Sequence, residues 1–185
     1  MKKIIFFAFI LLAAVSCKKD KNTDDSLGPT LDPRDAFVGE YELNVNANIS
    51  IRTSDETISG LIPENIPYEK QFSLVITKDT TKENQVNVSG FYNCTAIVSG
   101  NNLILESSTE TQNIKPSDFI SYELFDGITI PVTYSLVHKT ATLENDQITW
   151  HTDATGSASV NIVLTTIDFT GSAAIENTAY KLPDY

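Results

Sequence analysis

The side chains that could do catalytic or metal chemistry in this chain are few and far apart. It has two histidines, His138 and His151, and beyond its N-terminal segment a single cysteine, Cys94. Zinc sites use several His, Cys or carboxylate ligands at short, regular spacings, and these three residues do not provide them. We therefore expect no metal site and no cofactor, and we expect Cys94 to be a buried, inert strand residue.

The surroundings of the two histidines predict structural roles. His138 follows residues 132–136 in an alternating apolar pattern, so its imidazole is predicted to lie largely buried on the apolar face of a strand. His151 comes directly after Trp150 and is predicted to face out. Trp150 shares a strand face with Ile148, which makes it a candidate core or cavity-lining residue.

The sequence also has no recognisable motif for a hydrolytic active site. The sequence has no Gly-x-Ser-x-Gly motif, and residues 156–159 (Gly-Ser-Ala-Ser) predict a turn and the start of a strand. The acidic pairs at 24–25, 55–56 and 144–146 lie in polar segments, where a hydrated charge is the ordinary state. The sequence therefore predicts that the protein is not an enzyme, with a hydrolase of unrecognised site kept as a third hypothesis.

The N-terminus carries the one residue with a definite expected chemistry, Cys17. Lys2 and Lys3 precede an apolar run over residues 4–15, and Ala14-Val15-Ser16-Cys17 closes it. This order is typical of a secretory signal over residues 1–16, and the run is short for a membrane span. The ending resembles the lipobox of bacterial lipoproteins. The resemblance implies that the Cys17 thiol receives a diacylglycerol, that cleavage occurs before it, and that acyl chains such as palmitate anchor the chain. An ordinary secretory signal or an uncleaved anchor is the alternative.

The residues that follow predict a spacer and a location in the cell envelope. Residues 17–35 are polar and contain Pro29 and Pro33, so we expect a disordered tether between the lipid and a domain over 36–185. Lys18 stands where an aspartate can mark inner-membrane retention, which favours the outer membrane, facing either the periplasm or the outside. Losing Lys2 and Lys3 would change the net charge from −11 to −13, which excludes nucleic acid as a partner class.

The sequence of the domain predicts β-strands. Apolar residues alternate with polar ones from Tyr41 to Arg52, the pattern of a strand with one buried face. Residues 117–125 are the only candidate for a brief helix, with Phe119, Tyr122 and Phe125 on one side. About eight to ten antiparallel strands with short connections predict an all-β barrel, with a sandwich as the alternative. The other expected strands cover 72–77, 85–91, 94–98, 103–106, 128–140, 142–143, 147–152 and 158–169.

The opening of the first strand points to a particular barrel. Phe37-Val38-Gly39-Glu40-Tyr41 resembles the Gly-x-Trp or Gly-x-Tyr entrance of lipocalin-like (calycin) barrels, and residues 86–105 are similar to lipocalin-like lipoprotein domains of Gram-negative envelopes. The resemblance implies that Phe37, Gly39 and Tyr41 form a barrel floor. The late arginine that many lipocalins carry is absent, since the only arginines are Arg34 and Arg52.

A binding role is the most plausible function. Residues 53–69 form a long connection whose apolar members, Ile58, Leu61, Ile62 and Ile66, make it a candidate lid, with Trp150 as a further pocket residue. We expect a lipid-anchored, non-enzymatic module for a small apolar or amphipathic ligand or a glycan. The alternative is a structural or assembly subunit with a solid-packed barrel that binds an envelope protein. A cavity of several hundred Å³ beneath 53–69 would favour the binding module.

Overall fold

The computed structural model describes residues 31–115, 127, 129–162 and 165–183. The signal segment, Cys17, most of the tether and the candidate helix with Phe119, Tyr122 and Phe125 lie outside the described residues. Among the residues that the structure describes, no helix has the length and apolar character needed to cross a membrane. A compact unit begins at Asp32, so the last four residues of the expected tether belong to it.

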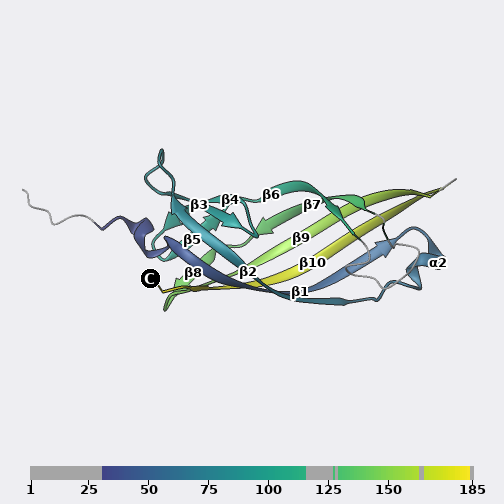
Figure 1. Ribbon diagram of the computed structural model, residues 1–185, viewed down its shortest axis with the longest axis horizontal. Coiled ribbons are helices and arrows are strands. Elements are labelled where there is room, and N and C mark those ends of the chain that lie inside the picture. Colours follow the sequence, from purple (N-terminus) through teal and green to yellow (C-terminus); the bar gives the residue numbers. More distant parts are fainter. Residues whose placement is uncertain (1–30, 116–126, 128, 163–164, 184–185) are drawn as a thin grey trace, which may run out of the picture. The chain divides into compact units, whose positions relative to one another are not determined.

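The described residues of this unit form ten strands and two short helical segments (Figure 1). All strand pairs are antiparallel, which confirms the predicted all-β class. In chain order the elements are η1 (Pro33–Ala36), β1 (Gly39–Thr53), α2 (Glu56–Ser59), β2 (Ile66–Lys78), β3 (Gln85–Gly90), β4 (Cys94–Ser99), β5 (Asn102–Leu105), β6 (Ser108–Ile114), β7 (Ile130–His138), β8 (Ala141–Glu144), β9 (Gln147–Ile162) and β10 (Thr165–Lys181).

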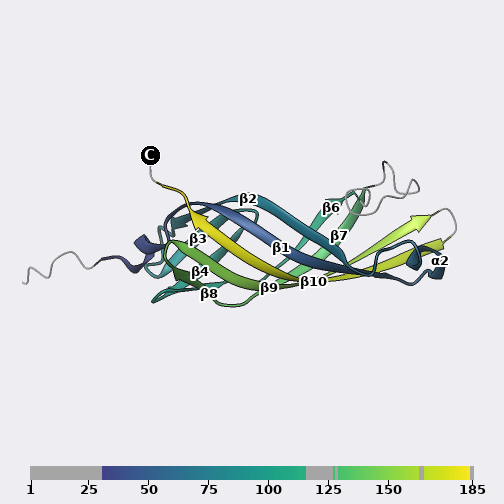
Figure 2. The same ribbon diagram turned by 90° about the horizontal axis from the view of Figure 1, so that it is seen from below.

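Eight of the strands close into a ring, in the order β10-β1-β2-β3-β4-β5-β8-β9, because β9 also pairs with β10. Four of them, β1, β2, β9 and β10, are much longer than the rest and run on past the ring (Figures 1 and 2). Residues 147–149 of β9 pair with β8, and residues 152–157 pair on the same edge with β7, which carries β6. We call the second part, β2-β1-β10-β9-β7-β6, the open segment. The barrel-like closure is compatible with a calycin-like fold.

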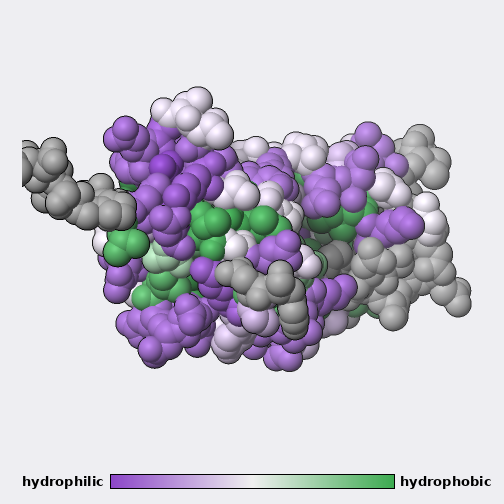
Figure 3. Space-filling model, turned by 60° about the vertical axis from the view of Figure 1, so that its left-hand side comes forward, coloured by the Kyte–Doolittle hydropathy of each residue, from purple (hydrophilic) through white to green (hydrophobic). Residues whose placement is uncertain are grey.

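Large inward side chains fill the ring. Strand alternation places every second residue inside, and in the ring these residues are almost completely buried. Its main members are Tyr41, Leu43, Leu74, Ile76, Val86, Val88, Leu103, Leu105, Ile148 and Trp150. On the outside, hydrophobic surface forms several green patches among hydrophilic residues (Figure 3).

The structure brings together the three residues expected at a barrel floor. Phe37 and Tyr41 are fully buried, and the Tyr41 hydroxyl donates a 2.7 Å hydrogen bond to the Phe37 carbonyl. Gly39 has φ +149°, and a Cβ there would lie 2.8 Å from Cε of Lys181, so a larger residue would be both strained and crowded.

η1 fastens the start of the domain to the ring. Asp32 caps η1 by accepting from the Arg34 N–H at 2.9 Å. The Arg34 guanidinium donates to the carbonyls of Asp79 and Lys82, at 2.9 and 2.8 Å, in the connection between β2 and β3. Hydrogen bonds from Arg34 hold the pKa of the Asp32 carboxyl well below its usual range.

Sequence and structure differ in the second half of the chain. The predicted turn at 156–159 is wrong, because these residues lie inside β9, and the strand predicted over 158–169 joins the end of β9 to the start of β10. Gly156 pairs with Gly171 within a continuous run of paired residues of β9 and β10. The glycine therefore marks a position inside a strand that has no side chain, and the chain does not turn there. Strand β6 was not predicted, since six of its seven residues are polar.

Candidate functional site

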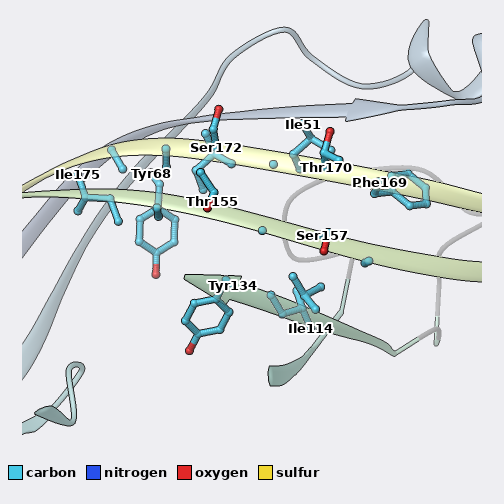
Figure 4. Close-up of a pocket in the computed structure, with 18 of the residues that line it drawn as sticks. Ile51, Tyr68, Ile114, Tyr134, Thr155, Ser157, Phe169, Thr170, Ser172 and Ile175 are labelled. Atoms are coloured by element: carbon cyan, nitrogen blue, oxygen red, sulfur yellow. The ribbon is translucent and has the colours of Figure 1, made fainter. Parts of the chain in front are cut away.

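The open segment contains an apolar cavity of about 320 Å³, which we call the trough. None of the described residues that line it carries a charge. Residues of β1 and β10 line one part, and residues of β9, β7 and the end of β6, together with Tyr68 of β2 and Phe91, line the rest (Figure 4). The main members are Val45, Ala47, Ile49, Ile51, Tyr68, Phe91, Ile114, Ile130, Val132, Tyr134, Ala154, Gly156, Ala158, Phe169, Gly171, Ala173 and Ile175.

Small residues facing small residues create the trough. On the inner face of β9 and β10, Gly156 stands opposite Gly171 and Ala154 opposite Ala173. Neither member of either pair has a side chain that could reach over its partner, so two consecutive rows of the sheet stay uncovered. An added Cβ at Gly171 would find only the Ser50 carbonyl oxygen within 4 Å, at 3.6 Å.

Two tyrosines border the trough. The rings of Tyr68, from β2, and Tyr134, from β7, extend to the same side of β9 and β10 in Figure 4. The Tyr134 hydroxyl donates to a Glu110 carboxylate oxygen at 3.1 Å, and the Lys70 ammonium lies 5.5 Å from the centre of the Tyr68 ring. Burial raises the pKa of both phenols, and Glu110 adds to the rise at Tyr134. These tyrosines place polar groups beside an otherwise apolar cavity.

A buried polar network closes the inner end of the trough. Asn177 donates to the Thr152 hydroxyl at 3.1 Å and accepts from the Tyr92 hydroxyl at 2.9 Å. His138 Nδ1 lies 2.9 Å from the same Thr152 hydroxyl, and its ring packs edge-on against Tyr92. Burial raises the pKa of Tyr92 to about 12 and lowers the pKa of His138. The prediction of a largely buried, hydrogen-bonded His138 is confirmed.

Two of the four expected lid residues, Ile58 and Ile62, lie near the outer end of the trough. Ile58, in α2, is buried against Ile167, and Ile62 and Phe169 pack against this pair. Phe169 also lines the trough, whereas Ile58 and Ile62 do not, so they contact the cavity wall only through Phe169. Asp55 caps α2 by accepting from the backbone N–H groups of residues 57 and 58.

The remaining candidate pocket residues lie elsewhere. Leu61 is exposed, and Ile66 opens β2 opposite Ile49. Trp150 is buried in the ring core beside Tyr92 and does not line the trough. The structure thus brings Ile58 and Ile62 to the trough's outer end and leaves Leu61 and Trp150 apart from it.

The other reactive side chains are accounted for structurally. His151 lies on the outer face of β9, with its ring nitrogens 2.9 Å from Asp153 and Glu176, and these hydrogen bonds raise its pKa. Burial raises the pKa of the half-buried Cys94 thiol to about 11. In the part of the chain that the structure describes, no group of three or more His, Cys, Asp or Glu residues could hold a metal.

Sequence reasoning missed the residues that make the trough. The signal was present as small residues at alternate positions, Ala154, Gly156 and Ala158 in one segment and Gly171 and Ala173 in another. It was passed over because glycine next to serine also predicts a turn. No protein-family model and no curated protein matches the chain.

Proposed function

We propose that this domain is a non-enzymatic binding module that holds a small apolar or amphipathic ligand in the trough. One observation carries the proposal: a cavity of about 320 Å³ whose described lining is uncharged and mostly aliphatic. This volume falls at the lower end of the range typical of small-molecule sites. Of the ligand classes considered from the sequence, a glycan fits least, because its many hydroxyls would lose hydrogen bonds to water at a lining that is mostly aliphatic and has only the hydroxyls of Tyr, Ser and Thr residues to replace them.

The site relates to the lipocalin resemblance in an unexpected way. The closed ring and the Phe37–Tyr41 floor support a lipocalin-like barrel, yet the ring interior is filled by its own side chains. The free volume lies where the long strands extend beyond the ring. A ligand would therefore bind in the open segment of the sheet, with the ring as a rigid base.

The ligand-binding proposal is tested with a fluorescent apolar probe, 1-anilinonaphthalene-8-sulfonate, titrated into the purified full-length protein. Gly171→Val places a β-branched side chain on the trough floor, and we expect it to weaken probe binding at least tenfold. Ala174→Val is the matched control, because Ala174 lies three residues along β10 on the exposed outer face. Equal binding by the wild type and Gly171→Val, with both proteins folded, would contradict the proposal.

The same module is proposed to be a lipoprotein of the cell envelope, anchored in the outer membrane through Cys17 after removal of residues 1–16. The charge pattern, the apolar run and the Ala-Val-Ser-Cys ending support this proposal. In cells fed labelled palmitate, Cys17→Ala is expected to abolish the label and to leave the precursor uncut. Cys94→Ala, the control, should label and process normally. Undiminished labelling of Cys17→Ala would overturn the anchor.

An assembly subunit is the second candidate, and one surface feature favours it. Ile97 and Ile104 stand opposite each other on β4 and β5 and are 46% and 51% exposed. Such a pair can dock on an envelope protein. If this is the main role, Ile97→Ser combined with Ile104→Ser should release a partner that co-purifies from the native envelope, whereas Gly171→Val should retain it. Retention of the partner by the double variant would contradict this role for the pair.

A further inference from the structure

We propose that the ligand of the trough is a single extended hydrocarbon chain, an unbranched alkyl or acyl group, lying along β9 and β10 with its terminal methyl toward Ile175. The inference rests on the proposed function, because it names the class of ligand that the same cavity takes. It is carried by the length, the width and the closed inner end of the trough.

The length follows from the row of inward residues on β10. Phe169, Gly171, Ala173 and Ile175 all line the trough, and six residue steps along one strand separate the first from the last. At about 3.4 Å per residue this row is about 20 Å long. A compact ligand of fused rings would leave much of that length empty, whereas an extended chain follows it.

The width follows from the sheet register. The uncovered floor is two strands wide, with the side chains of Ile49 and Ile51 rising on the β1 side and those of Val132 and Tyr134 on the β7 side. The two strands of this floor lie about 5 Å apart, whereas the row of inward residues along them is about 20 Å long. The trough is therefore elongated along the strands, a shape that an extended hydrocarbon chain follows.

The orientation follows from which end is closed. Beyond Ile175 and Val45, the next inward residues of the same strands are Asn177 and Leu43, and both are fully buried. Asn177 has its hydrogen bonds satisfied by Tyr92, Thr152 and backbone carbonyls, so it offers nothing to a ligand head group. The terminal methyl therefore packs at Ile175, and the polar end of the ligand lies toward Phe169.

The test is a series of straight-chain carboxylates of increasing length, competed against 1-anilinonaphthalene-8-sulfonate on the purified full-length protein. Burying one methylene stabilises a complex enough to raise affinity about fourfold. We expect this rise for each added methylene until the trough is filled, and a plateau beyond that length.

Larger side chains placed along the trough floor should block it, and they should move the affinity plateau to shorter carboxylates in a fixed order. Ala173→Leu, near the inner end, should stop the chain one row short, which is about 7 Å, and Gly171→Val should stop it two rows short. Chains short enough to stay outside the plug should bind within twofold of the wild type. Ala174→Leu, on the outer face next to Ala173, should leave the plateau in place. Circular dichroism checks that each variant is folded, and Gly171→Ala is the milder substitute if Gly171→Val is not.

The outcomes separate this inference from the proposed function. If the naphthalene probe binds but carboxylate affinity does not rise with chain length, the chain-shaped ligand is wrong while the apolar site stands. The same conclusion follows if both plugs weaken all chain lengths equally. If neither the probe nor any chain binds the wild type, both proposals fail.

Discussion

The ring and the open segment are built from the same strands, yet one is filled and the other is hollow. Strand β10 runs through both. In the ring its inward residue Ala179 stands between Ile148 and Leu43, whose large side chains cover it completely. In the open segment Ala173 stands between Ala154 and Ile49 and remains partly exposed. A small residue leaves space only where its cross-strand partner is also small.

This difference gives the two regions unequal shares in the stability of the fold. Burial of large apolar side chains in the ring supplies the folding free energy, while the trough keeps apolar surface uncovered at some cost in stability. The ring can then hold the long strands in place while the trough keeps its open volume. The predictions below compare matched residues in the two regions.

The largest contrast is expected from two isoleucines. Ile76 is fully buried in the ring, and Ile51 lines the trough half-buried. Ile76→Ala should lower the free energy of unfolding by about 2–5 kcal/mol, because it leaves a cavity in a packed core. Ile51→Ala should cost less than about 1 kcal/mol, because its site is already open. Urea denaturation measures both, and equal losses would show that the two regions are packed alike.

Adding volume should produce the opposite kind of contrast. Ala179→Val forces two methyl groups into a filled layer and should cost about 1–3 kcal/mol of unfolding free energy. Ala173→Val, on the same face of the same strand, should change it by no more than about 0.5 kcal/mol, because the trough has room. Thermal unfolding of the two variants gives the comparison. A large loss in Ala173→Val would mean that the trough is narrower than the structure has it.

A third contrast concerns two tyrosine hydroxyls. The Tyr92 hydroxyl is the donor to buried Asn177, and Tyr92→Phe leaves that amide oxygen without this partner, which should cost about 1–3 kcal/mol. The Tyr134 hydroxyl donates to exposed Glu110, which water can serve equally well, so Tyr134→Phe should cost less than about 0.5 kcal/mol. Urea denaturation of both variants decides, and a Tyr134→Phe loss as large as that of Tyr92→Phe would contradict the assignment.

The sequence predicted the ring better than the open segment, for a physical reason. Alternation from Tyr41 to Arg52 predicted β1, because its inward residues are large and the contrast with polar neighbours is strong. The trough requires the opposite, inward residues as small as Gly156 and Ala173, and these remove the apolar signal on which strand prediction depends. The residues that leave the cavity open are therefore the ones that local pattern identifies least well.

Turns and strand pairing differ in the same way, because a turn can be predicted from local residue types and the partner of a strand cannot. The predicted strands 142–143 and 147–152 leave only a tight connection over residues 144–146, where Asn145 and Asp146 both have positive φ, a local preference readable from their types. The pairing of β6 with β7 depends on contacts between distant residues, such as the hydrogen bond between Thr111 and Thr133, and no local sequence pattern predicts these contacts. Likewise, the sequence named Ile58 and Ile62 but could not show that they meet the cavity through Phe169.

The smallest expected effect is a pH contrast between the two histidines. Burial places the pKa of His138 below its ordinary 6.5, so the unfolded chain takes up this proton at a higher pH than the folded one. The His138 site therefore lowers the unfolding free energy as pH falls below 6.5. His151 has the opposite sign, since Asp153 and Glu176 raise its pKa. The stabilisation that protonated His151 contributes is fully present below pH 6.5 and is lost as the pH rises through the raised pKa of His151 in the folded protein.

Urea denaturation between pH 5 and pH 8 separates these two contributions. His138→Gln should reduce the loss of stability on acidification, because it removes an imidazole whose folded form resists protonation. His151→Gln should increase that loss, because it removes a cation that Asp153 and Glu176 stabilise at low pH. Exposure keeps the His151 effect the smaller of the two. If the two variants shifted the pH profile in the same direction, the surroundings of His138, at the end of β7, and of His151, on the outer face of β9, would not differ as the structure requires.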